Sequence, residues 1–267
     1  MVANFEKNTF KKRIKSMLGV DFRRMITSPL FYIMIGASLV MPILILIMTT
    51  MMDGSVSINP QTGEETIMEG FKNVWQIIGT STENSATMSM DITSMCNMNM
   101  MFFIIAIFVC IFVSEDFRSG YVKNLFAVRS KKDDYVISKS LVCFVAGASM
   151  IVSFFIGSMI GGAIAGLPFA LEGVSVVNII MCILSKILLV GIFSSIYLFA
   201  SVVAKQKLWL SLILSLGIGM LMFMMIPLIT PLNSTILNVF ACLIGSALFG
   251  YGIGVGSYFV LKKSSLI

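Results

Sequence analysis

The sequence predicts an all-α membrane protein with six transmembrane helices. Three observations support this fold class: the mean hydropathy is +0.96, 57% of the 267 residues are hydrophobic, and only 12% are charged. Soluble domains carry about 25% charged residues. We interpret residues 1–267 as one transmembrane domain, because no linker divides them.

Each span is predicted from a long apolar stretch, since a bilayer core needs roughly 20 such residues. The stretches cover about 30–52, 98–113, 141–165, 176–200, 208–226 and 237–261. Pro29 fits the first turn of the first span. The second stretch is short, so its helix is expected to extend outward through Asn97 and Asn99. Pro227 and Pro231 predict a re-entrant or interfacial helical piece on the outer side, before the sixth span.

The distribution of charge predicts the orientation of the spans. We expect the protein in the cell (plasma) membrane, with both ends of the chain in the cytoplasm. In this orientation, cytoplasmic segments hold 17 of the 19 Lys and Arg residues, and outer segments hold seven of the 13 acids. The positive-inside rule requires this asymmetry. It explains the net charge of +6 without a nucleic-acid partner. Residues 53–97 then form an acidic outer loop, in which the spacing of apolar residues from Ile67 to Ile78 predicts a short amphipathic helix.

Residues 1–28 predict a basic amphipathic helix that lies on membrane lipid. Its apolar residues recur at helical spacing, with Lys and Arg mainly between them: Phe10, Ile14, Met17, Leu18, Phe22 and Met25. Such a helix suits the headgroup layer of an anionic leaflet. The alternative is a solvated, positively charged flank of the first span.

Several kinds of chemistry are excluded by residue type. The chain has no His, no GxxxxGK[ST] phosphate loop and an odd number of Cys without metal-ligand spacing, so we expect no catalytic residues and no metal site. No Asp or Glu lies inside a predicted span, which disfavours a proton- or sodium-coupled carrier. The same absences disfavour a membrane-embedded enzyme or sensor.

The segment Ser114–Lys139 concentrates charge between the second and third spans. It holds ten charged residues in 26 positions, and Tyr121, Leu125 and Val128 share one helical face within it. A short amphiphilic helix of this kind can dock in a groove of a soluble partner, with Gly120 allowing a turn. The alternative is an ordinary charged loop.

This segment resembles the motif of type-2 ATP-binding-cassette (ABC) exporter permeases. In that family an acidic residue closes the second span, Gly follows, a hydrophobic-basic stretch leads to Arg or Lys, and Lys opens the third span. Glu115, Gly120, Leu125, Lys131 and Lys139 match these positions. The order of a basic helix, six spans and a Pro-broken outer piece is similar as well.

Two positions depart from the family pattern. Tyr121 stands near the place where the family often has Thr, and Val128 stands near its Pro. The match in architecture therefore extends further than the match in motif residues.

The resemblance implies a permease subunit of an ATP-driven exporter. A separate ABC ATPase, in two copies, would bind ATP and Mg, and this chain would need no cofactor of its own. A second permease would complete a homodimer or heterodimer. An amphipathic or peptide substrate, as in antimicrobial-peptide export and immunity systems, is the expected cargo. The alternative is an ATP-independent secondary transporter or channel. The expected ATPase-coupling residues are Glu115, Asp116, Arg118, Gly120, Lys123, Asn124, Leu125 and Lys131.

Two further features concern the spans. Lys186 is the lone charge within a predicted span, where burial in hydrocarbon costs roughly 2.5–3.5 kcal/mol. It is expected either to belong to the transport path or subunit seam, or to snorkel to the interface. Ser246, Gly250 and Gly254 recur every four residues and predict close helix packing, within one subunit or between two.

Overall fold

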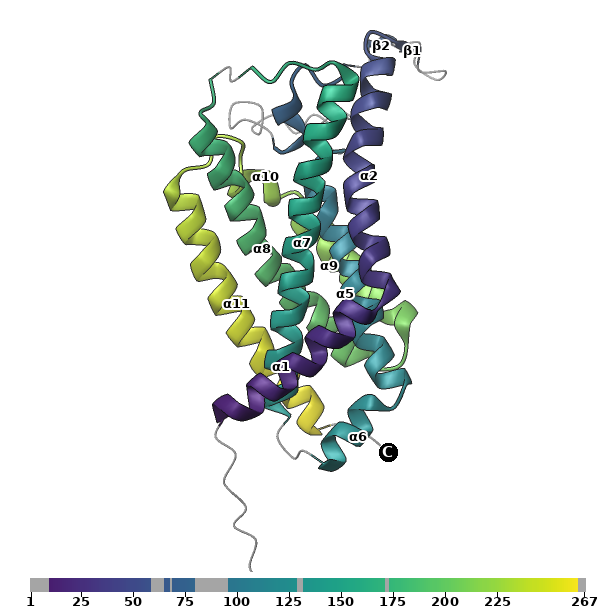
Figure 1. Cartoon of the computed structure of the whole chain (residues 1–267), viewed down its shortest axis with the longest axis vertical. Coiled ribbons are helices and arrows are strands. Elements are labelled where there is room, and N and C mark those ends of the chain that lie inside the picture. Colours follow the sequence, from purple (N-terminus) through teal and green to yellow (C-terminus); the bar gives the residue numbers. More distant parts are fainter. Residues whose placement is uncertain are drawn as a thin grey trace, which may run out of the picture.

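The computed structural model describes residues 10–58, 65–67, 69–79, 96–128, 132–170 and 173–263. These residues form an elongated bundle of helices (Figure 1). The long helices are α2 (Pro29–Met52), α5 (Met101–Arg118), α7 (Asp133–Ala165), α8 (Val176–Ala204), α9 (Leu208–Phe223) and α11 (Ile236–Lys263). The shorter elements are α1 (Phe10–Thr27), β1 (Val56–Ile58), β2 (Glu65–Ile67), η1 (Val74–Ile77), η2 (Met98–Met100), α6 (Tyr121–Val128) and α10 (Ile226–Ile229).

Five helical segments of the described chain are long and apolar enough to cross a membrane: α2, η2 with α5, α7, α8 and α11. The structure thus confirms a helical, multi-span protein. The predicted fifth span corresponds to α9, which is apolar but has 16 residues. At 1.5 Å per residue it is about 24 Å long, less than the roughly 30 Å of a bilayer core. The count of six spans therefore remains a prediction.

The bundle has two different ends (Figure 1). At one, α1 crosses the spans close to α6; we call this the α6 end. At the other, β1 pairs antiparallel with β2, with Val56 opposite Ile67; we call this the hairpin end. The helix α5 runs through the centre and its side chains Ile105, Val109 and Val113 are fully buried.

Small residues let neighbouring helices of the bundle approach one another closely. A Cβ built on Gly161 of α7 would lie 2.8 Å from the Cα of Ile43 in α2. A Cβ on Gly191 of α8 would collide with the hydroxyl of Ser246 in α11. Glycine at these positions allows contact between helix backbones, as it does in many membrane bundles.

The segment after α8 folds back along it. The Ser201 and Ser211 hydroxyl oxygens lie 2.7 Å apart near the α6 end, and the Asn238 side chain donates to the Ile229 carbonyl at 3.0 Å, close to the start of α11. Between them α9 and α10 run back along α8. Ile226 and Thr230 are buried, whereas Leu228 is exposed, so one side of the Pro-containing piece packs against the bundle.

The structure differs from the sequence prediction in the outer loop. No helix covers Ile67 to Ile78: Ile67 ends β2, and η1 is a single four-residue turn. The reason is tertiary contact with the start of the α7–α8 connection. The Val74 amide donates to the Pro168 carbonyl at 3.3 Å, and Trp75 Nε1 donates to the Phe169 carbonyl at 3.2 Å.

The second span also extends differently from the prediction. Asn97 caps η2, because its side-chain oxygen accepts from the Asn99 amide at 2.9 Å, and the helix does not continue outward through Asn97. Instead, α5 continues beyond Val113 to Arg118 at the α6 end. The additional turn carries Glu115 and Asp116 on the same helix as the span.

Candidate functional site

The connection between α5 and α6 is a tight turn built on Gly120. This residue has φ +73°, a conformation that costs glycine little and other residues more. The Asn124 amide donates to the Gly120 carbonyl at 3.1 Å, which starts α6 immediately after the turn. As a result Val122 is buried, whereas Lys123 and Asn124 are exposed.

Behind α6, four charged side chains from three helices meet in a buried ion network, formed by Asp21, Arg24, Asp116 and Lys139. Lys139 Nζ of α7 lies 3.0 Å from Asp21 Oδ1 of α1 and 2.8 Å from Asp116 Oδ2 of α5. Arg24 of α1 pairs with Asp116 Oδ1 at 2.7 Å. Three of the four side chains are fully buried, and that of Arg24 is 31% exposed. Two carboxylates thus balance two cations.

Neighbouring groups complete the network. The Tyr135 hydroxyl donates to Asp116 Oδ2 at 3.0 Å, and the Ser138 hydroxyl donates to Asp21 Oδ2 at 2.5 Å. The Lys139 ammonium also lies 4.0 Å from the centre of the Phe112 ring, a favourable cation–π distance. Buried charges are tolerated only with such partners, so the network defines one arrangement of α1, α5 and α7.

Three further contacts attach α1 and α6 to this junction. Arg13 of α1 forms an ion pair with buried Asp134 of α7 at 3.0 Å. The Arg24 guanidinium lies 4.1 Å from the Tyr121 ring centre at the start of α6. Phe126 of α6 packs edge-on against Tyr135, with ring centroids 5.9 Å apart. Because α6 contacts both α1 and α7, a displacement of α6 would move these two helices as well.

Arg24 stays charged in this setting. Burial lowers the pKa of its guanidinium, but the adjacent Asp116 carboxylate more than offsets this, and the pKa of Arg24 is raised above its ordinary value. Tyr121 changes in the same direction, because burial and the charge of Asp21 raise the pKa of its phenol. Both groups keep their protonation states at neutral pH.

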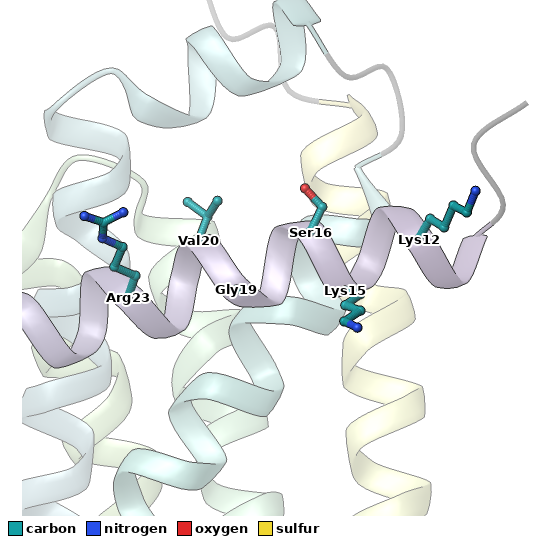
Figure 2. A pocket seen from close by; sticks show the side chains of 6 residues that line it. All are labelled: Lys12, Lys15, Ser16, Gly19, Val20 and Arg23. Carbon is teal, nitrogen blue, oxygen red and sulfur yellow. The ribbon is translucent and has the colours of Figure 1, made fainter. Parts of the chain in front are cut away.

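The exposed side of α1 forms a shallow groove beside α6. Its lining residues are Lys12, Lys15, Ser16, Gly19, Val20 and Arg23. Figure 2 shows Lys12, Ser16, Val20 and Arg23 pointing to the side of α1 on which α6 lies, and Lys15 pointing away from it. Basic groups thus flank a small apolar floor next to the exposed face of α6.

The residues expected to couple to an ATPase divide into several groups. Glu115 and Arg118 are exposed and lie 4.0 Å apart, and Lys123 and Asn124 of α6 are exposed as well. Leu125 is half-buried against the core. Asp116 differs, because it is fully buried in the ion network and has no surface to offer a partner. Gly120 forms the turn, and Lys131 lies outside the described residues.

Sequence reasoning missed the part of the site that belongs to α1. The sequence analysis gave Asp21 no role, and it placed Arg24 only among the basic residues of the predicted amphipathic helix. A signal was present, because Asp21 is the only acid within Phe10–Thr27 and shares a helical face with Met17 and Met25. All three are buried against the bundle.

Lys186 lies in a separate place, one third of the way along α8 from the hairpin end. Its side chain is fully buried, and Nζ donates to Asn99 Oδ1 at 2.5 Å and to Thr230 Oγ1 at 3.1 Å. It therefore does not snorkel to a surface of the chain. The predicted packing residues face α8 or α7: Ser246 abuts Gly191, Gly250 lies near Ser195, and Gly254 lies near Val136.

The described residues contain no group of three or more His, Cys, Asp and Glu side chains that could hold a metal ion. The site at the α6 end is instead an arrangement of balanced charges, a tight turn and a short exposed helix. Such an arrangement can transmit movement between helices.

Comparison with known proteins agrees with this interpretation. The family model described as ABC-2 family transporter protein matches residues 22–222, which is well over half of the chain. No curated protein and no solved structure matches it. The matched region begins within α1, directly after Asp21, and includes the other three members of the ion network, α6 and Lys186. The chain is therefore a membrane-spanning member of the ABC-2 transporter family.

Proposed function

We propose that this chain is the permease subunit of an ATP-driven exporter, and that a separate ATPase docks on the exposed faces of α6 and α1. The single observation that carries the proposal is the buried ion network. It joins α1, which provides part of the docking surface, to the spans α5 and α7. Membership of the family supports the transport role.

The proposed mechanism begins at the exposed residues of the junction. Closure of the ATPases on ATP pushes on α6, which is continuous with α5 through the Gly120 turn and contacts α7 through Phe126. The charge pairs hold α1, α5 and α7 together, so these helices move as one body. Rigid-body movement of packed helices switches access between the two sides of a membrane.

The α6 end is proposed to face the cytoplasm. Lys and Arg of α1, α6 and the end of α11 gather there, as the positive-inside rule predicts. We further propose that α9 and α10 together make a sixth crossing, because they run along α8 from that end to the depth of Lys186. Both chain ends would then be cytoplasmic, in the cell membrane.

Membership of the family also supports a proposal for the rest of the assembly. We propose two ATPase copies, which hold the ATP and Mg, and a second permease that is identical or similar to this one. The cargo is proposed to be an amphipathic or peptide substrate, as in antimicrobial-peptide export and immunity. Transport that persists without ATP would favour a secondary transporter or channel instead.

The test is co-purification of the tagged chain with the products of neighbouring genes, followed by an ATPase assay. An Arg118→Glu/Lys123→Glu variant is expected to lose the ATPase, because two exposed charges at the junction are reversed. The matched control is Lys72→Glu, a charge reversal at an exposed residue of the hairpin end, which should retain it. A wild-type chain that purifies alone, with no ATP hydrolysis, would contradict the proposal.

A further inference from the structure

Lys186 joins three segments of the chain at one point. It belongs to α8, its partner Asn99 belongs to η2 just before α5, and its other partner Thr230 directly follows α10. The ammonium is fully buried. Removal of this one group would leave the three segments without their shared polar contact.

Residues 226–232 comprise α10 and the turn that follows it, and we call them the α10 segment. This segment covers the part of α8 around Lys186. Cys182, one turn before Lys186, donates to the Thr230 carbonyl at 3.7 Å. A Cβ built on Gly79 would lie 3.6 Å from Cys182 Sγ and 3.4 Å from the Leu232 amide. Residues of the hairpin end and of the α10 segment thus close over Cys182, which is fully buried.

The contacts of Lys186 hold the segments without an ion pair among the described residues. Both its acceptors are neutral oxygens, and the Thr230 hydroxyl donates its own proton to the Ile226 carbonyl at 2.9 Å. A charged donor strengthens each hydrogen bond, and separation leaves no carboxylate unpaired, so that only the ammonium has to be hydrated when the contact breaks. This suits a contact that has to break and re-form.

We propose that Lys186 is the positioning residue of a gate at the hairpin end, which holds the α10 segment and the start of α5 against α8 while that end is closed. Opening breaks both hydrogen bonds and lifts the α10 segment from Cys182. The gate acts in the transport path of the proposed exporter, and to that extent the inference rests on the proposed function.

The test uses the native thiol of Cys182 as a probe. The full chain, with Cys96→Ser to remove a partly exposed thiol, is reconstituted in lipid nanodiscs without the ATPase and treated with a polar maleimide. Lys186→Met keeps the length of the side chain and removes both hydrogen bonds. It is expected to speed labelling of Cys182 at least about tenfold, the change that 1.4 kcal/mol produces. Lys72→Met, at an exposed lysine of the hairpin end, should leave the rate unchanged.

Two measurements keep the test decisive. Cys143 is buried in α7 toward the α6 end, and its continued protection in Lys186→Met shows that the bundle stays folded. Thr230→Val removes one acceptor and keeps the charge of Lys186, so it should speed labelling of Cys182 by a smaller factor. If Lys186→Met unfolds, the labelling rate of Thr230→Val tests the gate instead. Labelling at the wild-type rate in the folded variants overturns the gate.

Failure of the gate and failure of the exporter are distinguishable. Labelling of the chain alone reports the gate, whereas a change in Cys182 labelling on addition of ATPase and ATP reports coupling. If Lys186→Met speeds labelling but no ATPase binds the chain, the gate proposal is supported and the exporter proposal is contradicted.

Discussion

Replacement of Lys139 by Met should strongly destabilise the protein. The substitution removes the cation that lies 3.0 Å from Asp21 and 2.8 Å from Asp116, and leaves Arg24 to balance two buried carboxylates. Loss of one partner from a buried ion pair costs about 3–5 kcal/mol. For a chain of this size each kcal/mol shifts the unfolding midpoint by roughly 2–4 °C, so a decrease of about 6–20 °C is expected.

A double-mutant cycle shows whether charge balance is the cause. Asp21→Asn in the Lys139→Met background removes the unpaired carboxylate and leaves Arg24 with Asp116. The double variant should be more stable than the sum of the two single effects predicts, by roughly 0.5–3 kcal/mol. Tryptophan fluorescence during heating of the purified protein measures each midpoint.

The control for this cycle is Lys123→Met, because Lys123 is exposed on α6. A surface change of this kind is expected within about 0.5 kcal/mol of wild type. If Lys139→Met unfolded within about 2 °C of wild type, or if the two single effects simply added, the ion network would not hold the three helices together.

Three further predictions concern backbone geometry and topology. Gly120→Ala should cost about 1–2 kcal/mol because φ is positive there, whereas Gly19→Ala, with open space around it, should be neutral or stabilising in the same melting assay. Gly191→Ala should cost about 1–3 kcal/mol through overpacking, and Ser246→Gly in the same chain should restore the midpoint; no recovery would mean that this contact is not the cause. Lys207→Cys, between α8 and α9, should react with an impermeant maleimide only from the cytoplasmic side, and labelling from outside would contradict the six-span topology.

Hydropathy predicted the helices because burial in lipid depends on local composition. The start of α2 at Pro29 and the ends of α7 and α8 lie within a few residues of their predicted places. Gly120 was expected to allow a turn, and it forms one with positive φ. These features depend on residues close together in the sequence.

The ion network could not be predicted in the same way. Its members Asp21, Asp116 and Lys139 come from three helices, and a charge at the end of an apolar stretch usually indicates solvent. Asp116 was therefore expected at the surface beside Glu115, although the Asp116 side chain is fully buried and that of Glu115 is exposed. The prediction of a helix in the outer loop was wrong for a similar reason. Contacts of Val74 and Trp75 with the α7–α8 connection, which is distant in the sequence, override the local helical pattern.

The link between Asp21 and α7 has a consequence for biosynthesis. Ser138, which donates to Asp21, follows it by 117 positions in the chain. The helix α1 thus cannot complete its contacts until two spans and α6 have been made and α7 has entered the bilayer. Until then the Asp21 carboxylate lacks its partners Ser138 and Lys139 on α7, and a nascent chain that ends before Lys139 does not acquire the second of them. The helix α1 therefore reaches its final position only after α7, although it precedes α7 in the chain.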